Sequence, residues 1–576
     1  YFNATRPSDL TTLIDRGVSE EQAVRARSII QFIRQNRLSK YNNSPILPFS
    51  ESGLPAGKPF VLIVDQVAGD ASIAGALADE SRFGKMLQHA RKHYPDAVIA
   101  ARTHPAAGDR SPVLNAASRL GIDVSVPSRM NPWPLIEEAA AVYTVSSQLG
   151  FEALMAGTAV HSFGVTYYSH RGLTVDHCDA PAPRPPAALE QIFYAAYLAY
   201  SRYLDLHDRQ PVEIERALDQ MLTVRDQRNQ VSPRIYTGGL SPWKKRALDP
   251  FVIGPEGKAV HCGSLKTAIT LAGKNGGQVA LWGTSKPMPA TVPAVRFEDG
   301  FIRSRGLGAN LALPSSLAMD WDHVYYDARG ESRLEHIIAN RDFSPALVER
   351  AERLIASIVE KGVSKYNVGD AVAFPSVEPG RLKVLVPGQV EKDASIKYGS
   401  PQIKTNRGLV AAVRALYPDA YIAYKEHPDV TSGMRSGGEV PDAADIIVRE
   451  GDIKHWIAWC DRVETMTSLA GFEALIRNKP VGVHGIPFYA GWGLTDDRVA
   501  VPRRTRRISV EMLAAASLIL YPFYVHPLSG MPCRVEELVE EIALKRAVKV
   551  PAWRRLMLTI SQSINRSAVK IRDRRA

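Results

Sequence analysis

An internal repeat constrains the fold of this chain more than any other feature of its sequence. Six short motifs occur twice, in the same order, at spacings of 321 to 325 residues. The matched pairs are Tyr1–Ala4 and Tyr325–Ala328, Ser39–Asn42 and Ser364–Asn367, Gln66–Ser72 and Gln389–Ser395, His104-Pro105 and His427-Pro428, Gly150–Leu154 and Gly471–Leu475, and Gly172–Thr174 and Gly493–Thr495. Collinear matches at so long a period indicate two homologous modules and exclude a short-period solenoid.

Each module alternates helices and strands. Apolar residues at helical spacing predict helices over 20–36, 83–93, 344–361 and 406–416. Short apolar runs predict strands at 61–64, 97–100, 141–145, 384–387, 420–423 and 462–466. This order predicts doubly wound α/β domains built on parallel sheets.

The repeat also gives the expected domain boundaries. Residues 1–230 form the first module, 231–250 a linker rich in turn residues, 251–545 the second module and 546–576 a basic tail. The second module divides further into domains 251–365 and 366–545. Its residues 251–324 have no counterpart in the first module. We therefore expect the first module to lack most of its N-terminal domain.

The net charge of +11 is concentrated at the end of the chain. Residues 545–576 contain ten Lys or Arg and one acid, so the remainder is nearly neutral and offers no broad basic surface for nucleic acid. In this tail Trp553, Leu556, Ile560 and Ile564 share one helical face, which predicts a helix lying on an anionic membrane surface. A solvated basic tail is the alternative.

Hydropathy and cysteine spacing exclude several other classes of protein. No apolar run reaches the roughly 18 residues of a membrane span. The four cysteines lie far apart and form no C-x-x-C pair, which predicts neither a zinc site nor a disulfide framework. We therefore expect a cytoplasmic protein.

Asp70 and Asp393 follow the buried strands of the two modules, each at the end of a Gln-x-x-x-Asp motif that begins at Gln66 or Gln389. Ligands of parallel sheets bind beyond the carboxyl ends of the strands. These four residues are therefore candidates for catalysis and binding. A cap on the following helix is the alternative role for a lone aspartate.

Residues of three other kinds also follow predicted strands. A histidine before a proline can donate to a phosphate or be satisfied in the core, and hydroxyls before a helix can bind an anion or merely cap the helix. An acid one turn into such a helix can accept from sugar hydroxyls or simply suit the helix dipole. The residues concerned are His104, His427, Pro428, Ser146, Ser147, Thr467, Ser468, Glu152 and Glu473.

A paired-carboxylate turn, Glu298-Asp299-Gly300, lies in the segment without a counterpart. Adjacent acids can hold one raised pKa and act as a general acid or base. An acidic surface turn is the alternative. The chain has neither a P-loop nor a Gly-x-Ser-x-Gly motif, which argues against a P-loop NTPase and a serine hydrolase.

Taken together, these motifs resemble the KpsC/LipA-type capsule polysaccharide biosynthesis proteins, which are dual-module retaining β-Kdo glycosyltransferases. The resemblance covers nearly the whole chain and rests on Phe297–Phe301, Phe488–Asp497 and the repeated Gln-x-x-x-Asp, His-Pro and Gly-Phe-Glu-Ala-Leu motifs. It implies two tandem GT-B modules of Rossmann-like domains. Residues 251–365 would be the acceptor side, and 366–545 would bind the nucleotide sugar CMP-Kdo.

The resemblance also implies roles for the candidate residues. Retention by double displacement needs a carboxylate nucleophile, which maps onto Asp393 and Asp70, and an acid/base, which maps onto either Glu298 or Asp299. The His-Pro pairs and hydroxyl turns would hold the CMP phosphate. Glu473 and Glu152 would contact the cytidine part, and Lys425 would add positive charge. No cofactor and no metal is expected.

The first module departs from the family pattern. It has Tyr168–Gly172 as Tyr-Ser-His-Arg-Gly, where the second module has Tyr489–Gly493 as Tyr-Ala-Gly-Trp-Gly, and it lacks the acid-acid-Gly turn. We therefore expect the first module to be inactive and the second to be competent.

The resemblance finally implies a function and partners. The chain would build a poly-Kdo linker on a lysophospholipid or Kdo-primed glycolipid. It would be cytoplasmic and peripheral on the inner membrane through its basic tail, near the capsule export machinery and without nucleic acid. The alternatives are a GT-B transferase for CMP-sialic acid or a UDP-sugar, and a non-catalytic scaffold of capsule export.

Overall fold

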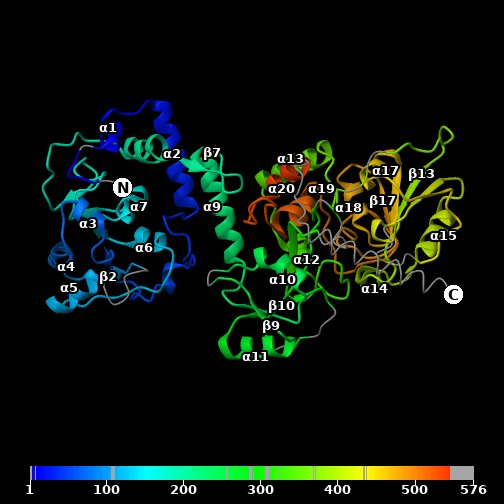
Figure 1. Cartoon of the computed structure of the whole chain (residues 1–576), viewed down its shortest axis with the longest axis horizontal. Helices are drawn as coiled ribbons and strands as arrows, with labels where there is room; N and C mark the ends of the chain where they lie inside the picture. Colours follow the sequence, from blue (N-terminus) through cyan, green and yellow to red (C-terminus); the bar gives the residue numbers. More distant parts are fainter. Residues whose placement is uncertain are drawn as a thin grey trace. The chain divides into compact units, whose positions relative to one another are not determined.

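The computed structural model describes residues 3–544 except 7, 105–110, 255–256, 285–287, 290, 305, 307–311, 322, 368, 370–371, 432–434 and 436–437. The predicted tail, 546–576, lies outside the described residues. The chain divides into two units, Tyr1–Asn229 and Gln230–Ala576, drawn from blue to green and from green to red in Figure 1. None of the described helices combines the length and the hydropathy needed to cross a membrane.

Unit 1 is built on one five-stranded parallel sheet. Its strands are, in spatial order, β2 (Val98–Arg102), β1 (Phe60–Val64), β3 (Ala141–Thr144), β4 (Val160–Ser162) and β5 (Val175–Asp176). Every residue of β1 is buried, as expected for a central strand covered on both faces.

Successive side chains of β1 point to opposite faces of the sheet, so the core of unit 1 is divided between the two faces. Val61 and Ile63 pack with α4 (Ser81–His93) and α5 (Pro112–Leu120). Residues 60, 62 and 64 pack with α6 (Trp133–Glu138) and α7 (Gln148–Ala156) on the opposite face. The sheet is therefore doubly wound, as predicted.

A further helical layer completes unit 1. Its elements are α1 (Asp9–Asp15), α2 (Glu20–Gln35), α8 (Leu189–Phe193), the π-helix 194–200, the hairpin of β6 (Tyr203–Leu204) and β7 (Pro211–Val212), and α9 (Ile214–Asn229). A capping box at Ser19 and Gln22 opens α2, the helix predicted at 20–36, and its apolar face packs against α8 and the π-helix.

Unit 2 contains a sheet that repeats the strand order of unit 1. Its strands are β15 (Ile446–Val448), β14 (Tyr421–Lys425), β13 (Lys383–Pro387), β16 (Arg462–Thr465), β17 (Val481–Val483) and β18 (Asp496–Asp497), all parallel. We call it the second sheet of unit 2. Because β13, β14, β16, β17 and β18 follow the order of β1 to β5, with β15 added, the repeat is confirmed as a repeat of fold.

Unit 2 also contains a mixed sheet, its first sheet. The order is β19 (Pro522–Tyr524), β12 (Ser316–Asp320), β11 (Ala294–Asp299), β10 (Gln278–Trp282), β8 (Ile235–Gly238) and β9 (Val260–Cys262). Strands β8 to β11 are parallel, whereas β12 pairs antiparallel with both β11 and β19.

Two of the expected domain boundaries differ from this topology. The linker predicted at 231–250 contains β8 and α10 (Pro242–Leu248), so these residues are part of the first sheet and its cover. The domain predicted at 366–545 contains β19, which returns to the first sheet. The turn-forming residues of 231–250 predicted a loop, but Ile235 and Tyr236 of this segment are buried and pair with β10.

Helices pack between and beside the two sheets of unit 2. They include α11 (Leu265–Asn275), α12 (Arg333–Asn340), α13 (Pro345–Glu360), α15 (Asn406–Leu416), α17 (Ile453–Trp459), α18 (Leu469–Leu475), α19 (Val510–Ala514), the π-helix 515–520 and α20 (Val535–Ala543). The predicted helices 344–361 and 406–416 are thus α13 and α15.

The glycine of each Gly-Phe-Glu-Ala-Leu motif allows a close contact. A Cβ at Gly471 would lie 2.2 Å from the hydroxyl of Tyr489, and one at Gly150 would lie 2.3 Å from that of Tyr168. In unit 2 the tyrosine hydroxyl donates to the Ser468 carbonyl oxygen at 2.5 Å. The motif therefore fixes the turn that precedes its helix.

Candidate active site

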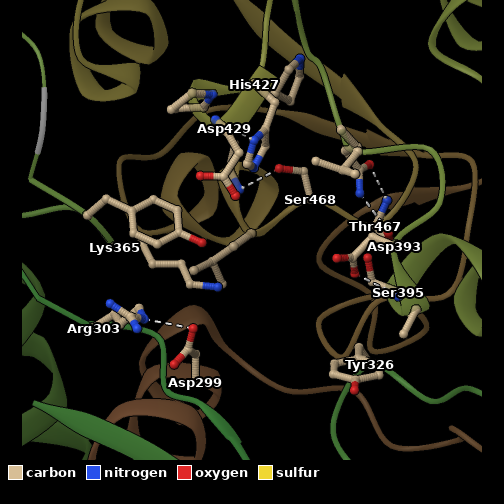
Figure 2. Close-up of a pocket in the computed structure, with 18 of the residues that line it drawn as sticks. Asp299, Arg303, Tyr326, Lys365, Asp393, Ser395, His427, Asp429, Thr467 and Ser468 are labelled. Carbon is tan, nitrogen blue, oxygen red and sulfur yellow. Dashed lines mark hydrogen bonds and ion pairs between the residues drawn. The ribbon is translucent and has the colours of Figure 1, made fainter. Parts of the chain in front are cut away.

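A cavity of about 860 Å³ in unit 2 gathers most of the predicted residues (Figure 2). Its lining comes from the carboxyl ends of β10 and β11 in the first sheet and of β13, β14 and β16 in the second sheet. This is the edge at which parallel sheets bind their ligands.

Asp393 lines this cavity and also caps a helix. One carboxylate oxygen accepts from the backbone N–H of Ser395 at the start of α14 (Ala394–Gly399), and the other lies 3.0 Å from an Arg435 guanidinium nitrogen. Burial acts to raise the pKa of Asp393, but the bonds from Ser395 and the charge of Arg435 outweigh it and leave the pKa below its usual range. The side chain is 39% exposed, so a ligand can reach an ionised carboxylate.

Gln389 is held entirely within the protein. Its amide nitrogen donates to the Thr467 hydroxyl at 2.9 Å, and its amide oxygen accepts from the Thr467 backbone N–H at 3.0 Å. The side-chain amide of Asn406 accepts from the backbone N–H of Gln389 and donates to its carbonyl oxygen, both at 2.9 Å. This buried side chain therefore joins the end of β13 to the turn after β16, and it positions that turn.

His427 presents one ring nitrogen to the cavity. Its Nδ1 accepts from the backbone N–H of Asp429 at 3.1 Å, so Nε2 carries the proton and can donate. Burial lowers the pKa of His427 despite the nearby carboxylate of Asp429, which keeps the ring neutral at neutral pH. Pro428 begins the short helix α16 (Pro428–Thr431) directly after it.

The turn after β16 adds hydroxyls to the same side of the cavity. Thr467 is oriented by Gln389, and Ser468 caps α18 by accepting from the Ala470 backbone N–H at 3.2 Å. Figure 2 shows Ser468 and His427 at one end of the cavity. These hydroxyl and imidazole donors suit an anion such as a phosphate.

The two acids of the predicted turn differ in their surroundings. Asp299 pairs with the guanidinium of Arg303 at 2.7 Å, and this arginine is almost fully buried. Glu298 instead accepts from the Tyr326 hydroxyl at 3.1 Å. Burial, and then the neighbouring charge of Asp299, raise the pKa of Glu298 to about 7. Glu298 is thus the acid whose proton is exchangeable near neutral pH.

Lys365 and Glu473 connect the two sides of the cavity. The backbone N–H of Lys365 donates to Glu473 at 2.8 Å, and both residues line the cavity. Burial acts to lower the pKa of Lys365, but the electrostatic effects of Tyr366 and Tyr325 and of the two acids at 298–299 outweigh it, so the pKa is raised and the amine is charged. Burial raises the pKa of Glu473. Figure 2 shows the Lys365 amine directed into the open space.

Lys425, expected to add positive charge, is buried and directed into the protein. Its amine donates to the Glu450 carbonyl oxygen at 3.2 Å. Burial lowers its pKa. The cation with a raised pKa in this cavity is Lys365, which the sequence reasoning did not single out. It belongs to the repeated Ser-Lys-Tyr-Asn motif, and Tyr326 belongs to the repeated motif at 325–328, so both carried a signal.

Unit 1 repeats part of this arrangement. Gln66 makes the same two bonds to Ser146 as Gln389 makes to Thr467: its amide nitrogen donates to the Ser146 hydroxyl at 2.8 Å, and its amide oxygen accepts from the Ser146 backbone N–H at 3.0 Å. Ser147 caps α7. Glu152 accepts from Ser39 and Lys40, and burial raises its pKa to about 7.

The aspartate of unit 1 makes the same cap as that of unit 2. Asp70 accepts from the backbone N–H of Ser72 at the start of α3 (Ala71–Gly75), as Asp393 does from Ser395, and it is exposed. His104 lies edge-on to Tyr41 at 6.1 Å, whereas the following proline lies outside the described residues. The acid-acid-Gly turn belongs to unit 2.

Comparisons with known proteins agree on one family. The model of the family described as capsule polysaccharide biosynthesis protein matches residues 3–203 and 287–525. The capsule polysaccharide modification protein LipA of Neisseria meningitidis is 38% identical over 548 residues, which cover 92% of this chain and 78% of that protein. The lipopolysaccharide-processing protein LpsZ of Rhizobium meliloti is 38% identical over 330 residues, 54% of this chain and 75% of that protein.

Two solved structures of Thermosulfurimonas dismutans KpsC are also similar to this chain. The one titled β-Kdo 2,7 transferase is 37% identical, covers 55% of this chain and all of that one, and has a TM-score of 0.46. The one titled β-Kdo 2,4 transferase is 31% identical, covers 54% of this chain and 98% of that one, and has a TM-score of 0.48.

Proposed function

The chain belongs to the family of capsule polysaccharide biosynthesis proteins, and we propose that unit 2 is a retaining glycosyltransferase that moves Kdo from CMP-Kdo to a glycolipid acceptor. One observation carries this proposal. A single cavity is lined by Glu298 and Asp299 from the first sheet and by Asp393 from the second. A double displacement requires a nucleophilic carboxylate and a separate acid/base.

The donor site follows from the polar groups opposite those acids. The Nε2–H of His427 and the hydroxyls of Thr467 and Ser468 would bind the phosphate of CMP. Lys365 would pair with the carboxylate of Kdo or the phosphate, because its amine stays charged within the cavity. Glu473, which already holds the backbone of Lys365, would accept from the nucleoside.

The reaction would proceed in two displacements. Asp393 attacks the anomeric carbon, the bond from that carbon to the phosphate oxygen breaks, and CMP leaves with the electron pair. An acceptor hydroxyl then attacks the same carbon and releases the Asp393 carboxylate. Two inversions at one carbon give net retention.

We assign to Glu298 the role of the base that accepts the proton of the acceptor hydroxyl. A base with a pKa near the working pH is most effective, and the pKa of Glu298 is raised to about 7. Asp299 is paired with Arg303, so its role is to hold negative charge beside Glu298 and keep the pKa of Glu298 high.

Unit 1 would bind nucleotide without transferring sugar. Its exposed Asp70 is not accompanied by an acid-acid-Gly turn in the sequence of the unit. The acceptor would be a lysophospholipid or a Kdo-primed glycolipid, reached at the membrane surface through the basic tail. Family membership and the tail sequence support this part of the proposal.

The test is transfer by the full chain from CMP-Kdo to a synthetic Kdo-primed glycolipid, with products identified by mass and NMR. Asp393→Ala should reduce the rate by roughly three orders of magnitude or more, whereas Asp70→Ala should leave it unchanged. Loss of transfer in Asp70→Ala alone would contradict the assignment. UDP-sugars or CMP-sialic acid serving as better donors would contradict the choice of substrate.

A further inference from the structure

Three histidines of unit 1 gather at a place that the proposed reaction does not use. His89 comes from α4, His161 from β4, and His177 directly follows β5. One ring nitrogen of each lies within 4.8 Å of those of the other two. His161 is buried and the other two are half-buried, so the group is enclosed but accessible to an ion.

Neighbouring aromatic rings fix the orientation of these imidazoles. His161 stacks on Tyr143 with ring centroids 4.4 Å apart, and His177 stacks on Phe163 at the same distance. The Tyr143 hydroxyl lies 3.1 Å from Nδ1 of His89. A metal-binding histidine commonly bonds through its second ring nitrogen to such an outer partner, which sets its tautomer.

The spacing of the nitrogens suits a small divalent cation. Nδ1 of His161 lies 3.0 Å from Nε2 of His177. Nitrogens bound to zinc at ~2.1 Å in tetrahedral geometry lie about 3.4 Å apart, so closing separations of at most 4.8 Å by up to about 1.4 Å would complete the set.

The equivalent place in unit 2 shows that the fold does not require these histidines. The repeat aligns them with Ala412, Gly482 and Arg498. A Cβ at Gly482 would lie 2.2 Å from the carboxylate of Glu464, which is buried and paired with Arg462 and His484. Unit 2 thus has an ion-pair network where unit 1 has three imidazoles.

We propose that His89, His161 and His177 bind one divalent first-row metal ion, of which Zn²⁺ is the probe. Three imidazoles leave a fourth position for water, and imidazole is a ligand that Zn²⁺ favours. The ion would tie α4 to β4 and to the edge strand β5, so its role is to stabilise the edge of the unit 1 sheet. This site is independent of the transferase proposed for unit 2.

The experiment measures Zn²⁺ binding by the full chain after removal of metal with a chelator and dialysis. Titration against a chromophoric competitor at pH 7.5 should give one ion per chain. His89→Gln and His177→Gln should each weaken binding by about 100-fold or more, because each removes a ligand. Zn²⁺ should raise the Tm of the wild-type chain but not that of these variants.

The control is His336→Gln, which changes a histidine in α12 of unit 2 whose side chain is 67% exposed. It should bind Zn²⁺ as the wild type does. A second probe, Co²⁺, should give the visible absorption of a tetrahedral site in the wild-type chain, which does not depend on how the variants fold. Failure of the wild type to bind Zn²⁺ stoichiometrically, or wild-type affinity in both ligand variants, would overturn the proposal.

Discussion

The raised pKa of Glu298 leads to an unusual prediction: Glu298→Gln should be more stable than the wild type at pH 8 and yet transfer sugar more slowly. Glu298→Gln keeps the shape of the side chain and an oxygen that can accept from Tyr326 and from the backbone N–H of Asp299. It removes only the ability to ionise in a largely buried place.

The magnitude follows from the shift of the pKa from 4.5 to about 7. The folded state holds this proton more tightly than the unfolded state, so the contribution to stability is complete below pH 4.5 and is lost as the pH rises to about 7. At 1.36 kcal/mol per pKa unit, the loss is of the order of 3 kcal/mol. Between pH 5 and pH 8, the wild type should lose more stability than Glu298→Gln by up to that amount.

The assay is urea denaturation at both pH values, followed by tryptophan fluorescence, since Trp243 and Trp282 line the same cavity. Other titrating groups are common to both proteins and cancel in the difference. At pH 8 the variant should also transfer about 10²–10⁴-fold more slowly. Glu349→Gln, at a side chain that is 69% exposed, is the matched control. Parallel pH profiles for wild type and Glu298→Gln would refute the burial argument, and retained transfer would refute the assignment of the base.

Two further substitutions test the neighbouring groups. Asp299→Asn leaves the buried guanidinium of Arg303 without its carboxylate partner, so we expect a loss of about 3 kcal/mol or more at pH 5, measured by the same denaturation. The loss should be smaller at pH 8, because the substitution also removes a charge that raises the pKa of Glu298; a larger loss at pH 8 than at pH 5 would contradict this. His427→Ala removes the Nε2–H donor and should raise the Kd for CMP roughly tenfold or more in calorimetry, with His336→Ala as the control; an unchanged Kd would exclude His427 from the phosphate site.

Local patterns predicted most of the architecture. The apolar spacing over 344–361 predicted α13, which begins at Pro345 with Ser344 as its cap. The repeat predicted two homologous modules, and the two parallel sheets share one strand order. The return of β19 to the first sheet was not predicted, because Pro522–Tyr524 pairs with residues 204 to 208 positions earlier and its three residues carry no periodicity.

In the candidate site too, contacts between residues far apart in the sequence could not be predicted. The sequence identified Gln389 as a residue at a strand end, but whether its amide faces a ligand or the protein depends on the turn after β16, some 78 residues away. Lys365 lies in the repeated Ser-Lys-Tyr-Asn motif, but the repeat alone does not tell a cavity residue from a structural one, and only the folded surroundings place Lys365 in the cavity. Asp393 caps α14, as its alternative role supposed, and it also lines the cavity, so its catalytic role stays a prediction.

The pairing of β12 with β19 has a consequence for how the chain folds during synthesis. Strands β8 to β12 leave the ribosome well before residues 522–524, so the edge of β12 remains unpaired until then. All strands of the unit 1 sheet, by contrast, lie within residues 60–176. The unit 1 sheet can therefore be completed before unit 2 is synthesised, whereas nascent unit 2 carries an open sheet edge for most of its translation and is the part that a chaperone would have to protect.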